Sequence, residues 1–162
     1  MRLPILLSVL PFFCLSAGCI NTDAAVFVEP SIKKAPEVTV SAGVLGIGLT
    51  GSFQLSLHLG PRATSASKVS LGTAEIVDAG KKGAIVAPLP VAAPIELPVT
   101  VELDSDVDVP FTFDTGDKPL KSELLPELCD PMGVVLSGAI QDSLQDHVTP
   151  FASAVFRPAG CM

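Results

Sequence analysis

The residues of this chain most clearly capable of covalent chemistry are its four cysteines, Cys14, Cys19, Cys129 and Cys161. In an oxidising compartment, two cysteines such as Cys129 and Cys161 pair as a disulfide. That bridge would close a loop of about 33 residues and contribute ~4 kcal/mol in the chain-entropy description. We therefore predict one disulfide between Cys129 and Cys161; the alternative is two free thiols.

The setting of Cys19 depends on the segment before it. Residues 1–18 begin with a positive charge at Arg2, continue with an apolar run over residues 3–15, and end in the small residues Ser16, Ala17 and Gly18. This three-part pattern is typical of a secretory signal peptide. The run is shorter than the roughly 20 apolar residues of a transmembrane helix. The sequence therefore predicts an exported protein whose residues 1–18 are removed.

The end of that segment, Leu15-Ser16-Ala17-Gly18-Cys19, resembles the lipobox of bacterial lipoproteins, with the leucine four positions before the cysteine. The resemblance implies that Cys19 carries a thioether-linked diacylglycerol, that cleavage follows Gly18, and that the new amino terminus is acylated. Several acyl chains on one cysteine hold a protein at a bilayer stably, whereas one chain does so only marginally. Cys14, inside the apolar run, lacks this context. The alternative is an ordinary secreted protein in which Cys19 is unmodified.

Residue 20 is isoleucine, where an aspartate would resemble the inner-membrane retention signal of Gram-negative lipoproteins. The resemblance therefore implies a bacterial cell-envelope location at the outer membrane. We expect the partners to be the lipid bilayer, through acylated Cys19, and a protein of the envelope.

Composition excludes several other classes of partner. Removing residues 1–18 leaves 144 of the 162 residues and changes the formal net charge from −7 to −8, because Arg2 is the only charged residue removed. Such an acidic domain has no electrostatic attraction to nucleic acid. The chain also has no Trp and no Tyr. Surfaces that bind sugars or stack bases rely on exposed aromatic rings, so carbohydrate is not an expected ligand either.

The rest of the chain has the pattern of short strands. Residues 19–36 are polar or proline-marked and predict a lipidated tether, followed by one domain over residues 37–162. The clearest strand is 52–59, in which apolar residues occupy every second position. The other strand candidates are 68–71, 73–77, 84–87, 99–103, 109–113, 134–140 and 151–156, with one short helix over 121–128 limited by Pro126. Strands at such intervals predict an all-β antiparallel sandwich, immunoglobulin-like in architecture; the alternative is a small β-barrel.

The residues Gly46 to Gly51 spell G-x-G-x-x-G. A dinucleotide site built on this motif needs a helix to begin there, so that its first amides face the pyrophosphate. Here the alternating strand pattern of 52–59 follows instead. We interpret the glycines as positions where a long strand bends or approaches a neighbour closely, and predict no cofactor.

The segment 104–108, with Asp104, Asp106 and Asp108, resembles the opening of a calcium-binding loop. An EF-hand needs Gly at its sixth position and Glu at its twelfth, and this chain has Val109 and Thr115 there. If the segment is extended, its aspartates share one solvated face. Calcium binding, completed by further carboxylates at positions 114 and 117, is the alternative to that acidic rim.

No catalytic constellation is recognisable. His58 and His147 are isolated in the sequence and predict no zinc site, and no G-x-S-x-G motif occurs. We therefore expect a non-catalytic binding or scaffolding lipoprotein, with the acidic segment 102–117 as a candidate contact surface. The alternatives are an accessory lipoprotein of an envelope secretion or assembly system, a carrier of a small apolar ligand, suggested by the Gly-rich strand at 43–51, or an enzyme of unrecognised type.

Overall fold

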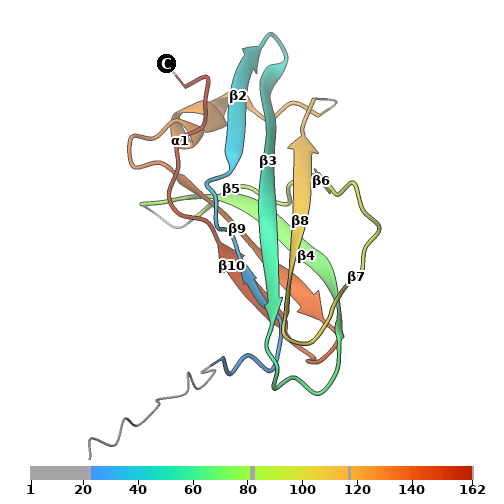
Figure 1. Ribbon diagram of the computed structural model, residues 1–162. Helices are drawn as coiled ribbons and strands as arrows, with labels where there is room; N and C mark the ends of the chain where they lie inside the picture. Colours follow the sequence, from blue (N-terminus) through green and yellow to red (C-terminus); the bar gives the residue numbers. More distant parts are fainter. Residues whose placement is uncertain (1–22, 81–82, 117, 162) are drawn as a thin grey trace, which may run out of the picture.

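The computed structural model describes residues 23–80, 83–116 and 118–161 as a β-sandwich (Figure 1). The predicted signal segment, Cys19 and the first residues of the predicted tether lie outside the described residues, as does Asp117. The sandwich confirms the predicted fold class. Its strands form two separate sheets and not one closed sheet, which sets aside the barrel alternative.

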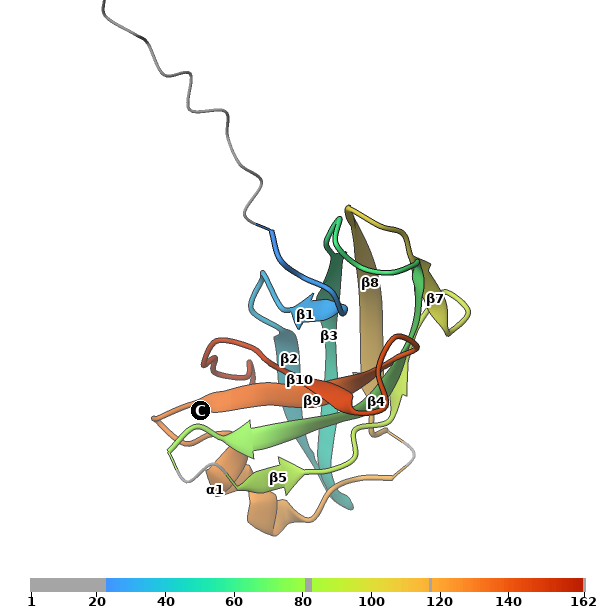
Figure 2. The ribbon, with the colours of Figure 1, turned by 90° about the horizontal axis from the view of Figure 1, so that it is seen from below.

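Each sheet has five strands, and all pairings between strands are antiparallel. The first sheet contains β1 (Glu29–Ser31), β2 (Glu37–Gly43), β3 (Gly46–Leu59), β6 (Val91–Ala92) and β8 (Ser105–Asp114). The second contains β4 (Ser67–Asp78), β5 (Ala84–Val86), β7 (Val99–Val101), β9 (Val134–Asp142) and β10 (Val148–Ala152). The strands of one sheet cross those of the other (Figures 1 and 2).

The long strand β3 is the centre of the first sheet, because β1 and β2 pair along one of its edges and β8 along the other. Its inward positions are Phe53, Leu55, Leu57 and Leu59, all buried. Phe53 stands opposite Phe111 of β8, and the two rings stack with centroids 5.1 Å apart. The alternation seen in the sequence therefore corresponds to an apolar face packed against the second sheet and a polar outer face, on which Gln54 is exposed and Ser56 is covered.

One open side of the sandwich is closed by the proline-rich segment 84–101. Its short strands alternate between the sheets: β5 and β7 pair with β4, whereas β6 pairs with β8. Between β5 and β6, the backbone N–H of Leu89 donates to the carbonyl of Ala74 at 2.8 Å. The prolines explain why these strands have only two or three residues.

The other side is closed by the C-terminal segment. Phe156 exchanges backbone hydrogen bonds with Val134 of the second sheet, and Ala159 bonds Val38 and Val40 of β2 in the first. The helical turns η1 (Ser122–Leu124) and α1 (Leu125–Leu128) lie where the short helix was predicted. Directly after α1, Cys129 is disulfide-bonded to Cys161, with the two Cα atoms 5.4 Å apart. The bridge thus ties the end of the chain to the sandwich.

The predicted tether over residues 19–36 is wrong in its described part. β1 is hydrogen-bonded to β3, with Pro30 opposite Leu57, and Val28 is 1% exposed. The short apolar run before β1 supplies an inward-facing side chain, so this segment belongs to the domain and not to a linker. The predicted domain start at residue 37 therefore falls too late.

Several strand boundaries also differ from the prediction: β3 begins at Gly46 and β8 at Ser105, before the predicted 52 and 109. Two further differences concern how a segment is paired. The candidates 68–71 and 73–77 are one strand, β4, with a register shift between Leu71 and Thr73. The last strand, predicted over 151–156, is β10 at Val148–Ala152, and Phe156 makes only an isolated bridge. In both places a Gly or a Pro within the pattern suggested a break that backbone pairing spans.

Candidate functional site

The two ends of the sandwich differ, and the difference defines the candidate site. The described chain begins at one end, formed by residues 23–28, 60–66, 102–105 and 143–147; we call this the entry end. The β2–β3 hairpin projects from the opposite end (Figure 1). We call that opposite region, made of residues 43–46, 86–90, 114–116 and 118–120, the distal end.

The tip of the β2–β3 hairpin exposes two large apolar side chains. Val44 is 104% exposed and Leu45 is 87% exposed, the highest values among the exposed large apolar residues of the described chain. The turn is closed by Gly43 and Gly46, and Gly46 has φ +141°, a conformation that L side chains rarely adopt. The hairpin thus presents an apolar pair in solvent at the end of a paired ribbon.

The base of the hairpin is fixed to the neighbouring segment. Ile47 and Leu120 exchange two backbone hydrogen bonds of 2.9 and 2.8 Å, and Ile47 is 1% exposed. Leu49 donates its backbone N–H to Oγ1 of Thr115 at 2.8 Å, and Thr115 donates its own N–H to the carbonyl of Leu49. Segment 114–120 is therefore the structural support of the exposed pair.

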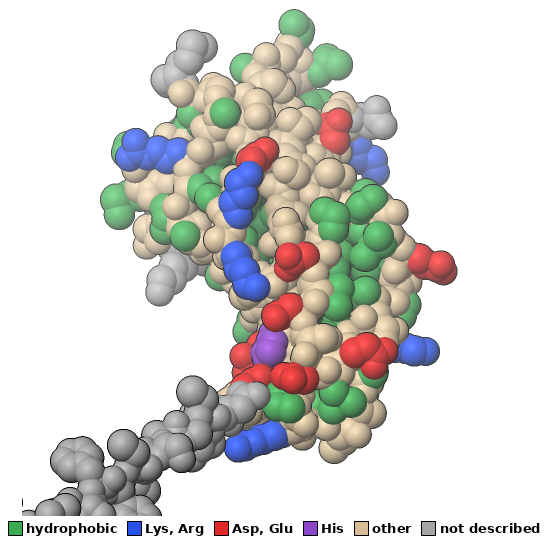
Figure 3. Space-filling view, in the orientation of Figure 1, with side chains coloured by type: hydrophobic (Ala, Val, Ile, Leu, Met, Phe, Trp, Pro, Cys, Tyr) green, Lys and Arg blue, Asp and Glu red, His purple; other side chains and the backbone are tan. Residues whose placement is uncertain are grey.

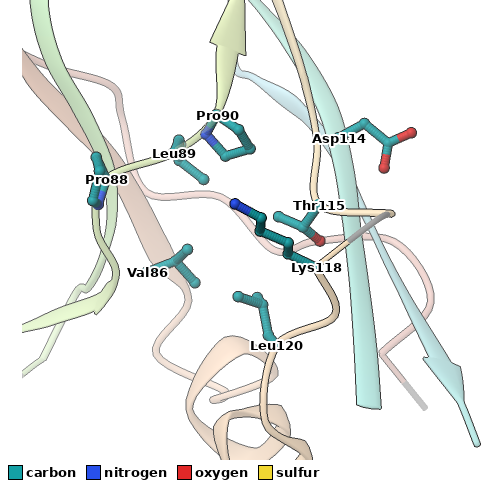
Figure 4. Close-up of a pocket in the computed structure, with 8 residues that line it drawn as sticks. All are labelled: Val86, Pro88, Leu89, Pro90, Asp114, Thr115, Lys118 and Leu120. Carbon is teal, nitrogen blue, oxygen red and sulfur yellow. The ribbon is translucent and has the colours of Figure 1, made fainter. Parts of the chain in front are cut away.

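A pocket of about 480 Å³ lies on the other side of that support (Figure 4). Apolar walls come from β5, the β5–β6 connection and Leu120, and polar groups come from the last residue of β8 and the segment that follows it. The lining residues are Val86, Pro88, Leu89, Pro90, Asp114, Thr115, Lys118 and Leu120. Ligand pockets span about 300–1,000 Å³ with mostly apolar walls and a few polar groups, and this one has both properties.

The polar groups of the pocket are not equivalent. The Lys118 ammonium extends over the apolar walls toward Leu89, whereas the Asp114 carboxylate points away (Figure 4). Oδ1 of Asp114 accepts the N–H of Gly116 at 2.7 Å, and Thr115 is buried with its oxygen engaged by Leu49. The pocket therefore combines an apolar floor with one cation at its mouth, which suits an amphiphile with an anionic group.

The candidate residues from the sequence lie mainly at the entry end. His58 Nε2 is 2.8 Å from Oδ2 of Asp23, and Nδ1 is 3.2 Å from Oδ1 of Asp106. The hydrogen bond with Asp23 raises the pKa of His58 above its ordinary value of 6.5, against a smaller opposing effect of burial. The N–H of Ala25, and then His58, lower the pKa of Asp23 below 3.8. His58 is thus an ion-pair partner and not an isolated histidine.

The calcium alternative is not supported by the arrangement of the aspartates. Asp106 and Asp108 share the outer face of β8, as expected for an extended segment, while Asp104 lies in the preceding turn with φ +53°. Asp106 is engaged by His58. No group of three or more His, Cys, Asp or Glu side chains that could hold a metal ion occurs within the described part of the chain.

The remaining sequence candidates are placed as follows. Gly46 to Gly51 lie within β3 and the hairpin turn, so no helix begins there and the motif has no phosphate-binding geometry. His147 contacts the ring of Phe27 edge-on, with ring centroids 6.4 Å apart. The acidic segment 102–117 divides between the two ends of the molecule: its first residues lie at the entry end and Asp114–Gly116 at the distal end.

Sequence reasoning missed the distal site. The sequence pattern places Val44 and Leu45 in the Gly-rich strand at 43–51, although the glycines on either side of them are the signal of a hairpin turn. Lys118 gave no signal, because its apolar surroundings come from the β5–β6 connection, far away in the sequence.

Comparison of the chain with protein-family models, with curated proteins and with solved structures finds no match. Within the described residues, no helix has the length and apolar character needed to cross a bilayer.

Proposed function

We propose that this chain is an envelope lipoprotein, anchored through acyl chains on Cys19, whose sandwich is a non-catalytic binding module that engages a protein partner with its distal end. One observation carries the choice of surface: Val44 and Leu45 are almost wholly in solvent at the hairpin tip, opposite the end at which the described residues begin. An anchor at one end leaves the other end free to meet a partner.

The chemistry of the tip defines the partner. Exposure of an apolar pair to water is unfavourable. Covering the pair with a pocket on the partner stabilises the complex by roughly 25 cal/mol per Å² of apolar surface buried. The surrounding small residues and Pro119 leave room for close approach of another backbone. The partner is therefore a protein that offers an apolar pocket to the tip, with little need for charge pairing.

The test replaces the tip and compares it with an exposed apolar residue elsewhere. V44S/L45S is expected to reduce partner capture from solubilised envelope membranes about ten-fold, the scale of a binding hot spot. The matched control is L103S, because Leu103 is 42% exposed and lies at the entry end. Equal capture by V44S/L45S and wild type would refute the distal surface, and equal loss in L103S would point to a nonspecific effect.

The pocket beneath Lys118 favours a second candidate function, a carrier of a small apolar ligand. The observation that supports a carrier is the open pocket of about 480 Å³ with its apolar walls, and not a cavity inside the core. An anionic naphthalene dye that fluoresces in apolar surroundings is expected to bind wild type and to lose that signal in L89D. K118E is expected to weaken binding of the dye. The control is K34E, because Lys34 does not line this pocket. No dye signal in wild type would reject this candidate.

A further inference from the structure

We infer that the entry end of the sandwich rests directly on the membrane, with Val26 and Phe27 in contact with a bilayer of zwitterionic, amine-bearing headgroups. This inference rests on the proposed lipid at Cys19. It goes beyond that proposal because a lipid anchor on a long linker would fix neither the orientation of the domain nor its distance from the membrane.

The first step is that the chain is fixed to the domain from Asp23 onward. Oδ1 of Asp23 accepts the N–H of Ala25 at 3.0 Å, and Oδ2 pairs with His58 at 2.8 Å. Ala25 is 7% exposed and Val28 is 1% exposed. Val28 donates its N–H to the buried Asp142 at 2.8 Å. These contacts make Asp23 part of the folded body.

The second step is the reach of the chain between the acylated residue and that body. Cys19 and Asp23 are four residues apart, and an extended chain spans at most about 3.6 Å per residue, so the two Cα atoms lie within about 14 Å of each other. The headgroup region is roughly 5–8 Å thick on each side of the hydrocarbon core. If the acyl chains of Cys19 enter that core and its Cα lies near the boundary of the hydrocarbon, Asp23 can lie at most about 6–9 Å beyond the headgroups.

The third step is what the entry end presents at that distance. Val26 and Phe27 are 44% and 41% exposed, beside the inward-facing Val28. The ring of Phe27 is held edge-on by His147. The apolar face of an interfacial helix lies about 5–10 Å deep at the boundary between headgroups and acyl chains, and we infer that Val26 and Phe27 reach the same boundary. The two side chains therefore add contacts to those of the acyl chains.

The fourth step is the charge of this end. Acidic side chains gather around a histidine beside the beginning of the described chain (Figure 3). Asp23 and Asp106 both face His58 there, and Asp106 is 59% exposed. Arg62 also acts on Asp23, but the carboxylates of this end, which include Glu102, Asp104 and Asp146, outnumber its cations. Carboxylates attract the ammonium group of a zwitterionic headgroup and are repelled by a surface of net negative charge. The occupant that fits is thus a zwitterionic, amine-bearing bilayer surface.

The absence of Trp from the chain permits a direct test. F27W and V44W each introduce a single indole, one at the entry end and one at the distal tip, in the full-length protein purified with its lipid and placed in vesicles of phosphatidylethanolamine and phosphatidylcholine. Bromine on the acyl chains quenches an indole that lies at the boundary of the hydrocarbon. We expect F27W fluorescence to fall about two-fold with brominated lipid and V44W fluorescence to stay unchanged. V26W is a second entry-end reporter, in case F27W perturbs the contact with His147.

Four results would overturn the inference. Unquenched F27W and V26W in protein whose Cys19 carries acyl chains by mass spectrometry would show that the entry end stands away from the membrane, while the proposed lipoprotein would stand. Quenching of V44W equal to that of F27W would show that the orientation is not fixed. Stronger quenching of F27W when anionic lipid is added at low salt would contradict the charge argument. If mass spectrometry finds Cys19 unmodified, the inference fails together with the proposed anchor.

Discussion

The backbone N–H of Val28 donates a hydrogen bond to Oδ2 of Asp142 at 2.8 Å, across 114 positions of sequence. Asp142 is 0% exposed and also accepts the hydroxyl of Ser67 and, at 2.9 Å, the N–H of Leu144. One carboxylate therefore joins the N-terminal segment, the start of β4 and the β9–β10 turn. This junction makes the entry end a single unit, and the membrane placement proposed above depends on that unit.

Removing this carboxylate is expected to destabilise the domain strongly. D142A removes the acceptor of the buried Val28 N–H, of the Ser67 hydroxyl and of the part-buried Leu144 N–H, and each buried group left unsatisfied costs about 1–3 kcal/mol. We expect the free energy of unfolding in urea to fall by about 3 kcal/mol or more. D142N retains one acceptor oxygen and is expected to lose less. An unchanged denaturation midpoint for D142A would contradict the junction.

His58 is expected to hold the N-terminal segment in a pH-dependent way. The pKa of His58 is raised above 6.5 in the folded state, mainly by the hydrogen bond with Asp23. The stabilisation is therefore complete below pH 6.5 and is lost as the pH rises through the folded-state pKa. The pKa of Asp23 is lowered, so its contribution is present above pH 3.8 and is lost as the pH falls through the lower folded-state value.

The measurement is cleavage by chymotrypsin at the Phe27–Val28 bond, which the docked segment protects because Val28 is buried. H58A is expected to be cut about three-fold faster than wild type at pH 6, and the ratio of the two rates should approach unity at pH 9. E37Q, which removes the exposed ion pair of Glu37 with Lys34, is the control and should match wild type. A ratio independent of pH would refute the role of His58.

The disulfide is expected to stabilise the domain by constraining the unfolded chain. C129S/C161S removes a cross-link between two residues 32 positions apart in sequence. The chain-entropy description gives a loss of about 4 kcal/mol in the free energy of unfolding. Reduction of wild type with dithiothreitol should lower the thermal midpoint to that of the double variant. Equal midpoints for oxidised wild type and C129S/C161S would contradict this prediction.

Thr115 is expected to support the distal end through one hydrogen bond. T115V keeps the volume of the side chain but removes the acceptor of the Leu49 N–H, at a cost of about 1–3 kcal/mol. T115S retains the hydroxyl and should keep most of the stability that T115V loses. Hydrogen exchange of the Leu49 amide is the direct readout: it should accelerate in T115V and not in T115S, and equal exchange in both would argue against the contact.

Local pattern was sufficient to predict the sandwich. The alternation over Phe53–Leu59 identified β3, because one face of a strand in a two-layer fold is buried and the other is not. The candidates 84–87 and 99–103 correspond to β5 and β7, and the prolines between residues 88 and 98 keep these strands and β6 short. The run Val26–Val28, in contrast, lies in the segment predicted as a tether, because three residues are too few to show a period and Asp142, the acceptor of the Val28 N–H, is distant in sequence.

The functional surfaces could not be predicted in the same way. His58 looked isolated because its partners, Asp23 and Asp106, lie 35 and 48 positions away. The pocket at Lys118 forms only when the β5–β6 connection folds over the end of β8. Exposure of Val44 and Leu45 depends on the position of the turn, and sequence hydropathy alone assigns such residues to a core. These features come from tertiary contacts and not from neighbours along the chain.

The central claim is that acyl chains on Cys19 hold this sandwich at a membrane, and intact-mass analysis of the mature protein tests it most directly. The account predicts a chain that begins at Cys19, with the added mass of a diacylglycerol and an amide-linked acyl group, and C19A should lack this mass and partition into the aqueous phase of a detergent separation. A mature protein with an unmodified Cys19, or wild type and C19A partitioning alike into the aqueous phase, would contradict the account.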